Sequence, residues 1–270
     1  MEYLKEILIS KKEEIKKIGK NSSLIKSELE KTGRYKRSFL NNIGSGKVNV
    51  IAEIKRASPS RGIINDQLDL RETVLAYDGF KNFICGISVL TESLYFKGSP
   101  EDIKVVRENS DLPVLRKDFI FSDKQIYESA ALGVDCILLI GTLLGKRKLK
   151  KLYHLAVSLG LEVLVEIHSL EDLDKVLDTG ARFIGVNNRN LRDMSVDSNI
   201  IYKFLDYSQK NDIRDRVFVC ESGIEDVGYI KDLFSRGINT FLIGSYFMAS
   251  RDLKNTLKSM ELGLREKKLI

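Results

Sequence analysis

Charged and polar side chains recur at the ends of short apolar segments along much of this chain. In the first such segment, Glu53 stands inside the apolar sequence from Ile51 to Ile54, and Lys55 follows it at once. Charged groups are seldom buried without partners, so this pattern predicts side chains that face a polar site. The residues of this kind are Glu53, Lys55, Lys117, Glu166, Asn187, Arg189, Glu221 and Ser222.

Lysines set among carboxylates favour proton-transfer chemistry. The set contains no histidine and no cysteine, so a Ser–His or Cys–His nucleophile is not expected. In one pocket, Lys55 and Lys117 would lower each other's pKa, whereas the carboxylates would raise both. Both lysines would also repel a cation, and we therefore expect no metal ion. For any single residue, the alternative role is an ion pair that closes the top of the fold.

Two glycines near the end of the chain suggest a site for phosphate. Gly223 follows Glu221 and Ser222, and Gly244 with Ser245 follows the last apolar segment. Backbone N–H groups at such positions bind phosphate in many barrel enzymes, and glycine lets the ligand approach the backbone closely. His168, two residues beyond Glu166, is expected to stabilise a strand end rather than to catalyse.

From Val48 onward, short apolar segments alternate with amphipathic ones, which predicts strands alternating with helices. The predicted strands are 48–54, 84–90, 114–116, 134–140, 162–167, 182–186, 217–220 and 240–243. The predicted helices are 70–81, one from Pro100, 122–132 with Ser122 as N-cap, 146–159, one opened by a capping box of Ser169 and Asp172, 198–209, 225–236 and 253–262. Eight such units predict an α/β fold, a (β/α)8 TIM barrel with its active site at the carboxyl ends of the strands.

Residues 1–45 differ from the rest and predict an N-terminal helical extension packed on the barrel. Apolar residues recur at helical spacing up to Ile18, and further helices are expected at 22–31 and 35–43. Acids and bases are interleaved in this region, as in Lys11-Lys12-Glu13-Glu14, which is typical of a solvated helix face. No linker-like composition interrupts the chain, and residues 1–270 are expected to form a single domain.

The composition limits the partners and the compartment. The formal net charge of +6 favours anionic ligands, but acids and bases are mixed, which argues against a nucleic-acid partner. Cys85, Cys136 and Cys220 are widely spaced and lie in apolar segments, as buried free thiols do in a reducing compartment. There is no secretory signal and no apolar segment long enough for a membrane span, so we expect a cytoplasmic protein with no membrane partner.

Six motifs, in this order, resemble those of the indole-3-glycerol phosphate synthase family. They are IAEIKRASPS at 51–60, SVLTE at 88–92, LRKDF at 115–119, LVEIH at 164–168, IGVNNRNL at 184–191 and ESGI at 221–224. The motifs span nearly the whole predicted barrel, and the N-terminal helices are also similar to that family's extension. Arg61, where many members have lysine, and the sequence at 245–247 depart from the family pattern.

The resemblance implies a phosphorylated small-molecule substrate, 1-(2-carboxyphenylamino)-1-deoxyribulose 5-phosphate. It implies that the enzyme, a carboxy-lyase of tryptophan biosynthesis, closes the pyrrole ring and releases CO2 and water to give indole-3-glycerol phosphate. No metal or organic cofactor is implied, and a monomer is compatible with the resemblance. The aromatic carbon that bears the carboxylate must attack the C2′ carbonyl of the ribulose.

The resemblance also implies roles for individual residues. Lys117 matches the general acid that protonates the C2′ carbonyl oxygen, and Lys55 matches a lysine that holds the substrate's anionic groups. Glu166 matches the acid/base carboxylate of the dehydration, with Glu53 beside it. The remaining matches are Asn187 and Ser222 as orienting groups, Arg189 and Glu221 as their supporting pair, Phe119 in the aromatic pocket, Ser58 at the carboxylate, and Gly223, Gly244 and Ser245 as the phosphate cradle.

Three alternatives stand beside this interpretation. Phosphoribosylanthranilate isomerase is another phosphate-binding barrel enzyme, but it would need a Cys/Asp acid–base pair at strand ends. A Schiff-base aldolase would use Lys117 or Lys55 as its nucleophile. A basic, non-catalytic binding protein would not need so complete a set of polar residues at strand ends.

Overall fold

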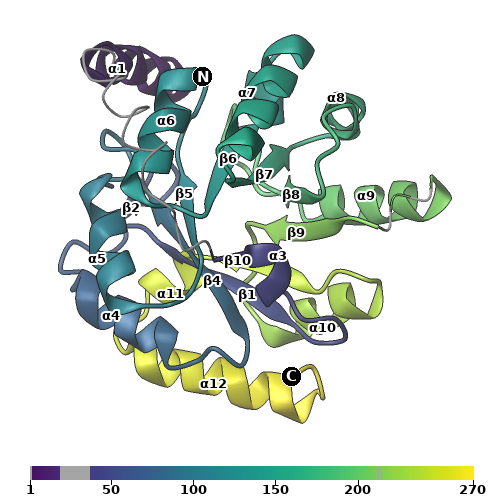
Figure 1. The fold of residues 1–270 in the computed structure, drawn as a ribbon. Helices are drawn as coiled ribbons and strands as arrows, with labels where there is room; N and C mark the ends of the chain where they lie inside the picture. The colour runs from purple at the N-terminus through teal and green to yellow at the C-terminus, as the bar shows by residue number, and fades with distance from the viewer. Residues whose placement is uncertain (1, 19–36, 212, 214) are drawn as a thin grey trace.

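Eight parallel strands close into a barrel, as the alternation of apolar and amphipathic segments predicts (Figure 1). The computed structural model describes residues 2–18, 37–211, 213 and 215–270. Around the barrel the strand order is β1-β10-β9-β8-β7-β6-β5-β4. The strands are β1 (Asn49–Ile54), β4 (Ile84–Leu90), β5 (Val114–Lys117), β6 (Cys136–Ile140), β7 (Glu162–Ile167), β8 (Phe183–Asn187), β9 (Val217–Glu221) and β10 (Thr240–Ile243).

Helices follow the strands and cover the outside of the barrel. They are α4 (Leu70–Asp78), α5 (Glu101–Asn109), α6 (Asp123–Leu132), α7 (Lys146–Ser158), α8 (Leu173–Leu177), α9 (Asn199–Lys210), α10 (Val227–Ser235), the short α11 (Ser245–Met248) and α12 (Leu253–Glu266). The expected N-cap of α6 is confirmed, because Ser122 accepts a hydrogen bond from the backbone of Lys124 and forms a capping box with Gln125.

The predicted capping box at Ser169 is wrong. A 3-10 turn, Leu170–Asp172, precedes α8, and the Ser169 side chain makes no capping hydrogen bond. Asp172 instead accepts a hydrogen bond from Thr142 and pairs with Lys175, 2.6 Å away. The carboxylate therefore binds the side chains of Thr142 and of Lys175 on α8 rather than the backbone N–H groups at the start of that helix.

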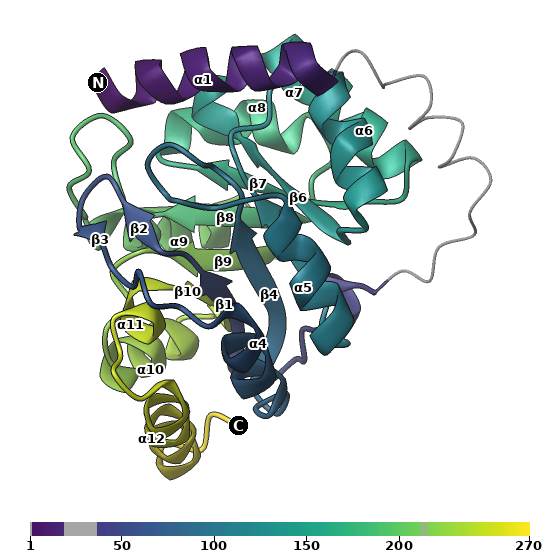
Figure 2. The same ribbon diagram turned by 90° about the vertical axis from the view of Figure 1, so that its left-hand side faces the viewer.

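Two elements of the N-terminal extension are described, and they contact opposite ends of the barrel. Helix α1 (Glu2–Ile18) packs against α6, and its N-terminal end extends toward the side that carries the small hairpin of β2 (Ala57–Ser58) and β3 (Gly62–Ile63) (Figure 2). The predicted helix at 22–31 lies outside the described residues. The one predicted at 35–43 is shorter than expected, because α3 spans only Phe39–Asn42.

Phe39 closes the amino-terminal end of the barrel. Its side chain is fully buried, its ring centroid lies 6.0 Å from that of Phe183, and a Cβ on Gly86 would meet the ring at 2.1 Å. The carboxylate of Glu162 holds this segment, because it accepts hydrogen bonds from the Ser38 hydroxyl at 2.5 Å and from the Phe39 backbone at 2.7 Å. Glycine is thus required in β4 where the aromatic ring enters.

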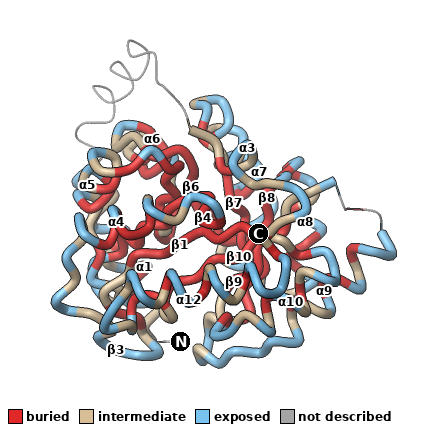
Figure 3. The backbone as a smooth tube through the Cα atoms, turned by 90° about the horizontal axis from the view of Figure 1, so that it is seen from below, coloured by how far each residue is buried: buried red, intermediate tan, exposed pale blue. Residues whose placement is uncertain are grey.

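Two apolar layers fill the molecule, one between strands and helices and one inside the barrel. Figure 3 shows the strands as buried backbone at the centre and the outer helices as partly exposed. Side chains of alternate strands share a level inside a barrel of this kind. One such level is apolar and comprises Ile51, Leu115, Leu164 and Val219. Because side chains alternate along a strand, the next inward residues of the same four strands form the level above.

Candidate active site

The level above that apolar layer consists of three carboxylates and one lysine. They are Glu53 on β1, Lys117 on β5, Glu166 on β7 and Glu221 on β9. Glycine stands beside two of the acids, at Gly185 in β8 and at Gly244 directly after β10: a Cβ on Gly185 would meet Glu221 Oε1 at 2.0 Å, and one on Gly244 would meet Glu53 Oε1 at 2.4 Å. The absence of these two side chains makes room for the carboxylates inside the barrel.

A cavity of about 880 Å³ opens above this layer at the carboxyl ends of the strands. Every residue that the sequence predicts for the site lines it. The set comprises Glu53, Lys55, Ser58, Lys117, Phe119, Glu166, Asn187, Arg189, Glu221, Ser222, Gly223, Gly244 and Ser245. The structure therefore brings together residues that are up to 192 positions apart in the chain, from Glu53 to Ser245. Their individual roles stay predictions.

Lys117 is the centre of the charge network. Its Nζ donates hydrogen bonds to Glu166 Oε2 at 3.1 Å and to Glu221 Oε2 at 2.5 Å. Burial by itself would lower the pKa of Lys117, but the negative charges of Glu166, Glu221 and Glu53 outweigh it and raise that pKa well above its usual value. Lys117 is therefore held as an ammonium group, which can donate a proton but is a poor base or amine nucleophile.

The two carboxylates that contact Lys117 have opposite pKa shifts. Burial and the negative charge of Glu166 raise the pKa of Glu221 to about 8, although Lys117 opposes this. Burial would also raise the pKa of Glu166, but Lys117 and His168 outweigh it and lower that pKa well below its usual value. Two acids with separated pKa values are suited to one proton-donating and one proton-accepting role. Lys55 pairs separately with Glu53, its Nζ lying 2.7 Å from Oε1.

Replacing Glu221 by glutamine is expected to reduce the loss of stability at alkaline pH. The pKa of Glu221 is raised from 4.5 in the free side chain to about 8, so the folded protein keeps a proton there that the unfolded chain releases. This contribution to stability is present at low pH and is lost as the pH rises from about 5 through about 8. Urea unfolding at these two pH values should show a larger loss for the parent than for Glu221→Gln.

The exposed rim residue Glu225 provides the control for that measurement. Its side chain is 68% exposed and pairs with Arg61, so Glu225→Gln should leave the pH dependence of the unfolding free energy as in the parent. Equal pH dependence in the parent and in Glu221→Gln would contradict the assignment of the raised pKa to Glu221.

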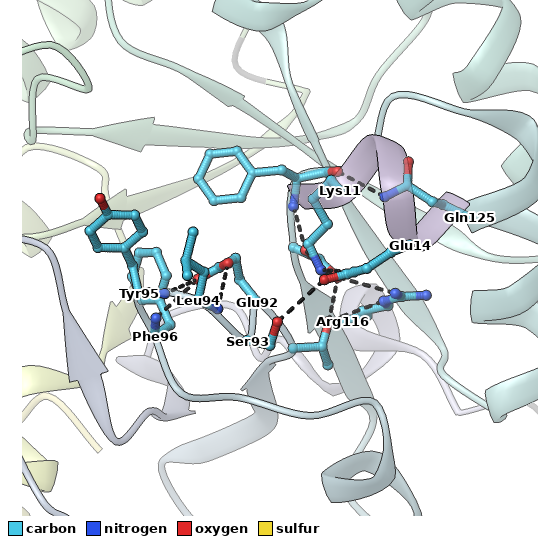
Figure 4. Close-up of polar contacts among 12 residues, drawn as sticks. Lys11, Glu14, Glu92, Ser93, Leu94, Tyr95, Phe96, Arg116 and Gln125 are labelled. Carbon is cyan, nitrogen blue, oxygen red and sulfur yellow. Dashed lines mark hydrogen bonds and ion pairs between the residues drawn. The ribbon is translucent and has the colours of Figure 1, made fainter. Parts of the chain in front are cut away.

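Helix α1 reaches the site through a buried ion pair, which corrects the expectation of a solvated face at Lys11. The Lys11 side chain is 1% exposed, and its Nζ lies 2.9 Å from Asp118 Oδ1 and 2.8 Å from Glu14 Oε2. Burial would lower the pKa of Lys11, but Asp118 and Glu14 raise it above its usual value. Figure 4 shows Lys11 and Glu14 of α1 among these polar contacts with Arg116 of β5. The charge of Lys11 can be buried because two carboxylates neutralise it, Asp118 after β5 and Glu14 on the same helix.

Asp118 connects this pair to the site, because it lies between Lys117 and Phe119 in the chain. Its Oδ2 accepts hydrogen bonds from Thr91 at 2.7 Å and from Arg116 at 3.1 Å, and its Oδ1 accepts one from the Phe119 backbone at 2.8 Å. Burial would raise the pKa of Asp118, but Arg116 and Lys11 lower it. The Asp118 carboxylate stays ionised and fixes the backbone between the cavity residues Lys117 and Phe119.

A second buried carboxylate orders the loop after β4. The side chain of Glu92 accepts backbone hydrogen bonds from Leu94 at 2.8 Å, Tyr95 at 2.8 Å and Phe96 at 3.0 Å, and these four residues are labelled in Figure 4. Phe96 and Phe119 both line the cavity, with ring centroids 6.5 Å apart. The loop therefore supplies an apolar wall on which an aromatic ring can pack.

The rim opposite that wall is built from the ends of β8, β9 and β10. Ser222 and Gly223 have positive φ angles of 67° and 78°, which is uncommon for serine and is associated with functional sites. Gly244 precedes α11, whose first-turn N–H groups have no partner within the helix. These backbone groups give the rim the hydrogen-bond donors that an anion needs.

Arg189 and Glu221, expected as the pair that supports Asn187 and Ser222, make separate contacts, and the Arg189 backbone donates a hydrogen bond to Asn187 Oδ1 at 2.9 Å. Arg189 donates a hydrogen bond to the Met194 carbonyl at 2.8 Å, whereas Glu221 contacts Lys117. Burial lowers the pKa of Arg189, and the nearby Arg61 adds to this. Arg189 therefore supports the loop after β8, in which Met194 also has a positive φ of 64°.

Sequence reasoning missed several residues of the cavity and its surroundings. Ser60, Phe96, Leu191, Met194 and Val196 line it from loops, and Lys11 and Thr142 act from outside it. Ser60 and Leu191 carried a signal as members of the motifs at 51–60 and 184–191, and Phe96 as an aromatic residue close behind the SVLTE motif. Met194 and Val196 depend on loop geometry, and Lys11 and Thr142 on tertiary contacts, which no periodic pattern records.

In the described ranges, no group of three or more His, Cys, Asp or Glu residues is placed to hold a metal ion. No helix within the same ranges is both long and apolar enough to cross a membrane. Cys85, Cys136 and Cys220 are buried free cysteines, as the sequence predicts.

A closed parallel barrel with lysine–carboxylate contacts at the carboxyl ends of its strands defines a (β/α)8-barrel enzyme of the acid–base class. Solved structures support the fold alone. Similar to it are 3-hexulose-6-phosphate synthase from Salmonella typhimurium (TM-score 0.59, 16% identity, 82% of this chain and 100% of that one) and a thiamine phosphate pyrophosphorylase from Pyrococcus furiosus (TM-score 0.58, 14% identity, 85% and 99%).

The sequence comparisons are more specific. The family pattern described as indole-3-glycerol phosphate synthase matches residues 4–260. A relative of that name from Aliarcobacter butzleri is 40% identical over 259 residues, 95% of each chain. Another, from Campylobacter jejuni strain RM1221, is 42% identical over 214 residues, 79% of this chain and 81% of the relative. The chain belongs to the indole-3-glycerol phosphate synthase family, which confirms the resemblance seen in the six motifs.

Proposed function

We propose that the cavity converts 1-(2-carboxyphenylamino)-1-deoxyribulose 5-phosphate into indole-3-glycerol phosphate, CO2 and water. The protein is then a carboxy-lyase of tryptophan biosynthesis. The observation that carries the proposal is the ammonium group of Lys117, held between Glu166 and Glu221 on the cavity floor. Ring closure places negative charge on the C2′ oxygen, and a proton donor held beside it stabilises the transition state.

The other floor residues complete the proton transfers. Lys117 gives its proton to the C2′ oxygen as the aromatic carbon attacks C2′, and it regains a proton from solvent after turnover, because loss of CO2 from the carboxylate consumes one overall. Loss of CO2 restores the aromatic ring, and Glu166 serves as the acid/base carboxylate while water departs, with Glu53 beside it. Lys55 binds the anthranilate carboxylate and keeps the reacting carbons together, and Ser58 adds a hydrogen bond there. Glu53 holds Lys55 in place, at 2.7 Å.

The walls and the rim of the cavity orient the substrate. Phe119 packs against the anthranilate ring, and Asn187 and Ser222 donate hydrogen bonds to the sugar hydroxyl groups. The phosphate lies on the backbone N–H groups of Gly223, Gly244 and Ser245. The positive φ angles at Ser222 and Gly223 support this assignment, because turns of this kind can expose successive backbone N–H groups to an anion.

The two enzymatic alternatives fit the site less well. Burial raises the pKa of the Cys85 and Cys220 thiols to about 12, so they are poor acid–base groups for an isomerase. The raised pKa of Lys117 disfavours the neutral amine that a Schiff base requires. A monomer in the cytoplasm, acting without metal or organic cofactor, completes the proposal.

Indole fluorescence tests the proposal directly. The chain contains no tryptophan, so indole emission that grows on addition of the substrate comes from product. We expect this emission to appear with a chelator present and at the same rate as without it. No emission from folded protein would overturn the proposed function, and emission that a chelator abolishes would overturn its metal independence.

A further inference from the structure

His168 connects Glu166 to a chain of hydrogen bonds that leads away from the cavity. Its Nε2 lies 3.2 Å from Glu166 Oε1, and its Nδ1 lies 3.0 Å from the Thr142 hydroxyl. Thr142 in turn lies 2.5 Å from Asp172 Oδ2. The His168 side chain is 9% exposed, so its two ring nitrogens face these groups rather than bulk water. Nothing in the proposed reaction uses the imidazole.

The far end of this chain determines which ring nitrogen carries a proton. Burial would raise the pKa of Asp172, but its contacts with Lys175 and Thr142 lower it. The Asp172 carboxylate is therefore ionised and only accepts hydrogen bonds. Thr142 has a single hydroxyl proton, which it donates to Asp172. The Thr142 oxygen must then accept from His168, so Nδ1 of His168 carries a hydrogen.

This tautomer places the basic nitrogen of His168 against the Glu166 carboxylate. In a neutral ring with hydrogen on Nδ1, Nε2 has only its lone pair, which faces the lone pairs of Oε1 at 3.2 Å. The contact becomes attractive once a proton lies between the two atoms. The other oxygen of Glu166 accepts from Lys117 and is not available for that proton.

We propose that His168 is a positioning residue that shares one proton with Glu166, and that Thr142 and Asp172 fix its tautomer. The proposal rests on the proposed function of Glu166 as the acid/base carboxylate. With the proton on Nε2, Glu166 is a carboxylate held in place by an imidazolium and can accept a proton from the substrate carbon. With the proton on Oε1, Glu166 can donate it to the departing hydroxyl. The proton taken from carbon is returned in the water, so the pair holds one proton at the start and end of a turnover.

The charged neighbours of the pair come from several elements. Lys117 of β5 and Glu221 of β9 lie on the cavity side of Glu166. Asp172 and its partner Lys175 lie beyond Thr142 on the outer side. Lys117 pairs with Glu221 on the cavity side, and Lys175 pairs with Asp172 on the outer side. The negative charge next to a positive His168 is therefore that of the Glu166 carboxylate.

Nitrogen-15 spectroscopy of the histidine rings tests the tautomer in the whole parent protein without substrate. The chain has two histidines, and His154 lies exposed on α7, so His154→Gln assigns the signals. We expect neutral His168 to carry its hydrogen on Nδ1, the form that free histidine disfavours. Thr142→Val should shift it toward hydrogen on Nε2, and Glu166→Gln should change the Nε2 signal. Hydrogen on Nε2 alone in the neutral parent ring, or an Nε2 signal unaffected by Glu166→Gln, would overturn the proposal.

Steady-state kinetics distinguish two roles for His168: sharing a proton with Glu166, or only orienting its carboxylate. His168→Gln retains an N–H donor near Nε2 but has no titratable proton. We expect kcat to fall by about 10²-fold with little change in KM, whereas His154→Gln retains the parental values. Parental kcat in His168→Gln would mean that the donor suffices and would overturn the proposal. Absence of product from the parent chain would refute the proposed function instead, and the spectra would still decide the tautomer.

Discussion

Replacing Lys117 by alanine is expected to lower kcat by about 10³-fold or more while KM changes by less than about tenfold. The ammonium group is the proton donor on the cavity floor, and water admitted to the vacated space carries no charge and is not held beside the C2′ oxygen. In the proposed function, substrate binding depends mainly on Lys55, the aromatic wall and the phosphate rim rather than on Lys117. Steady-state indole fluorescence gives both constants, and binding of a non-reacting substrate analogue gives the affinity separately.

Loss of a buried cation between two acids also affects the folded state, so the measurement needs a control. Lys104 on α5 is 76% exposed, and Lys104→Ala should keep the parental kcat and KM. The circular dichroism spectrum of Lys117→Ala should retain the parental shape, because Glu221 can take up a proton in place of the lost cation. Near-parental turnover by Lys117→Ala would refute the general-acid role.

The second large effect is expected for Glu166→Gln, with a fall in kcat of about 10² to 10⁴-fold and no unfolding. Glutamine has the shape of glutamate but cannot accept the proton. Lys117 keeps Glu221 as a partner at 2.5 Å, so no buried cation is left unpaired. Because the pKa of Glu166 is lowered in the folded protein, its ionised form contributes stability at neutral pH, and the thermal unfolding midpoint should fall below the parental value while the protein stays folded.

The matched control for this variant is Glu13→Gln on α1, where the side chain is 61% exposed. Its kcat and unfolding midpoint should be parental. A collapsed circular dichroism spectrum of Glu166→Gln would assign Glu166 to structure rather than to chemistry. Full activity with an intact fold would remove it from the proton transfers altogether.

Strand–helix alternation could be predicted from the sequence because each of the eight barrel strands is largely buried and contains a run of apolar residues. Residues at strand ends were predictable for the same reason, since the barrel topology sends all carboxyl ends to one face. The pairing of Lys117 with both Glu166 and Glu221 was not, because it depends on how the closed barrel staggers its strands.

Features outside the periodic pattern could not be predicted. The two-residue strands β2 and β3 are too short for an alternation signal. Lys11 belongs to a run of charges that is typical of a solvated face, and only the position of Asp118 on the barrel explains its burial. Asp172 has the spacing of a capping box, but its carboxylate contacts the side chains of Thr142, 30 residues away in the chain, and of Lys175 on α8 instead.

Two glycines beside the cavity floor are as necessary for the proposed reaction as the charged residues, although they have no side chain. At Gly185 and Gly244, even a methyl group would occupy the space of a Glu221 or a Glu53 carboxylate oxygen. An alanine there would displace an acid from the cavity floor while leaving every charged residue in the sequence intact. A protein with this barrel can therefore lose the proposed activity although every charged residue of the cavity floor is retained. Glycine at positions 185 and 244 is thus as informative about the activity as the acids next to it.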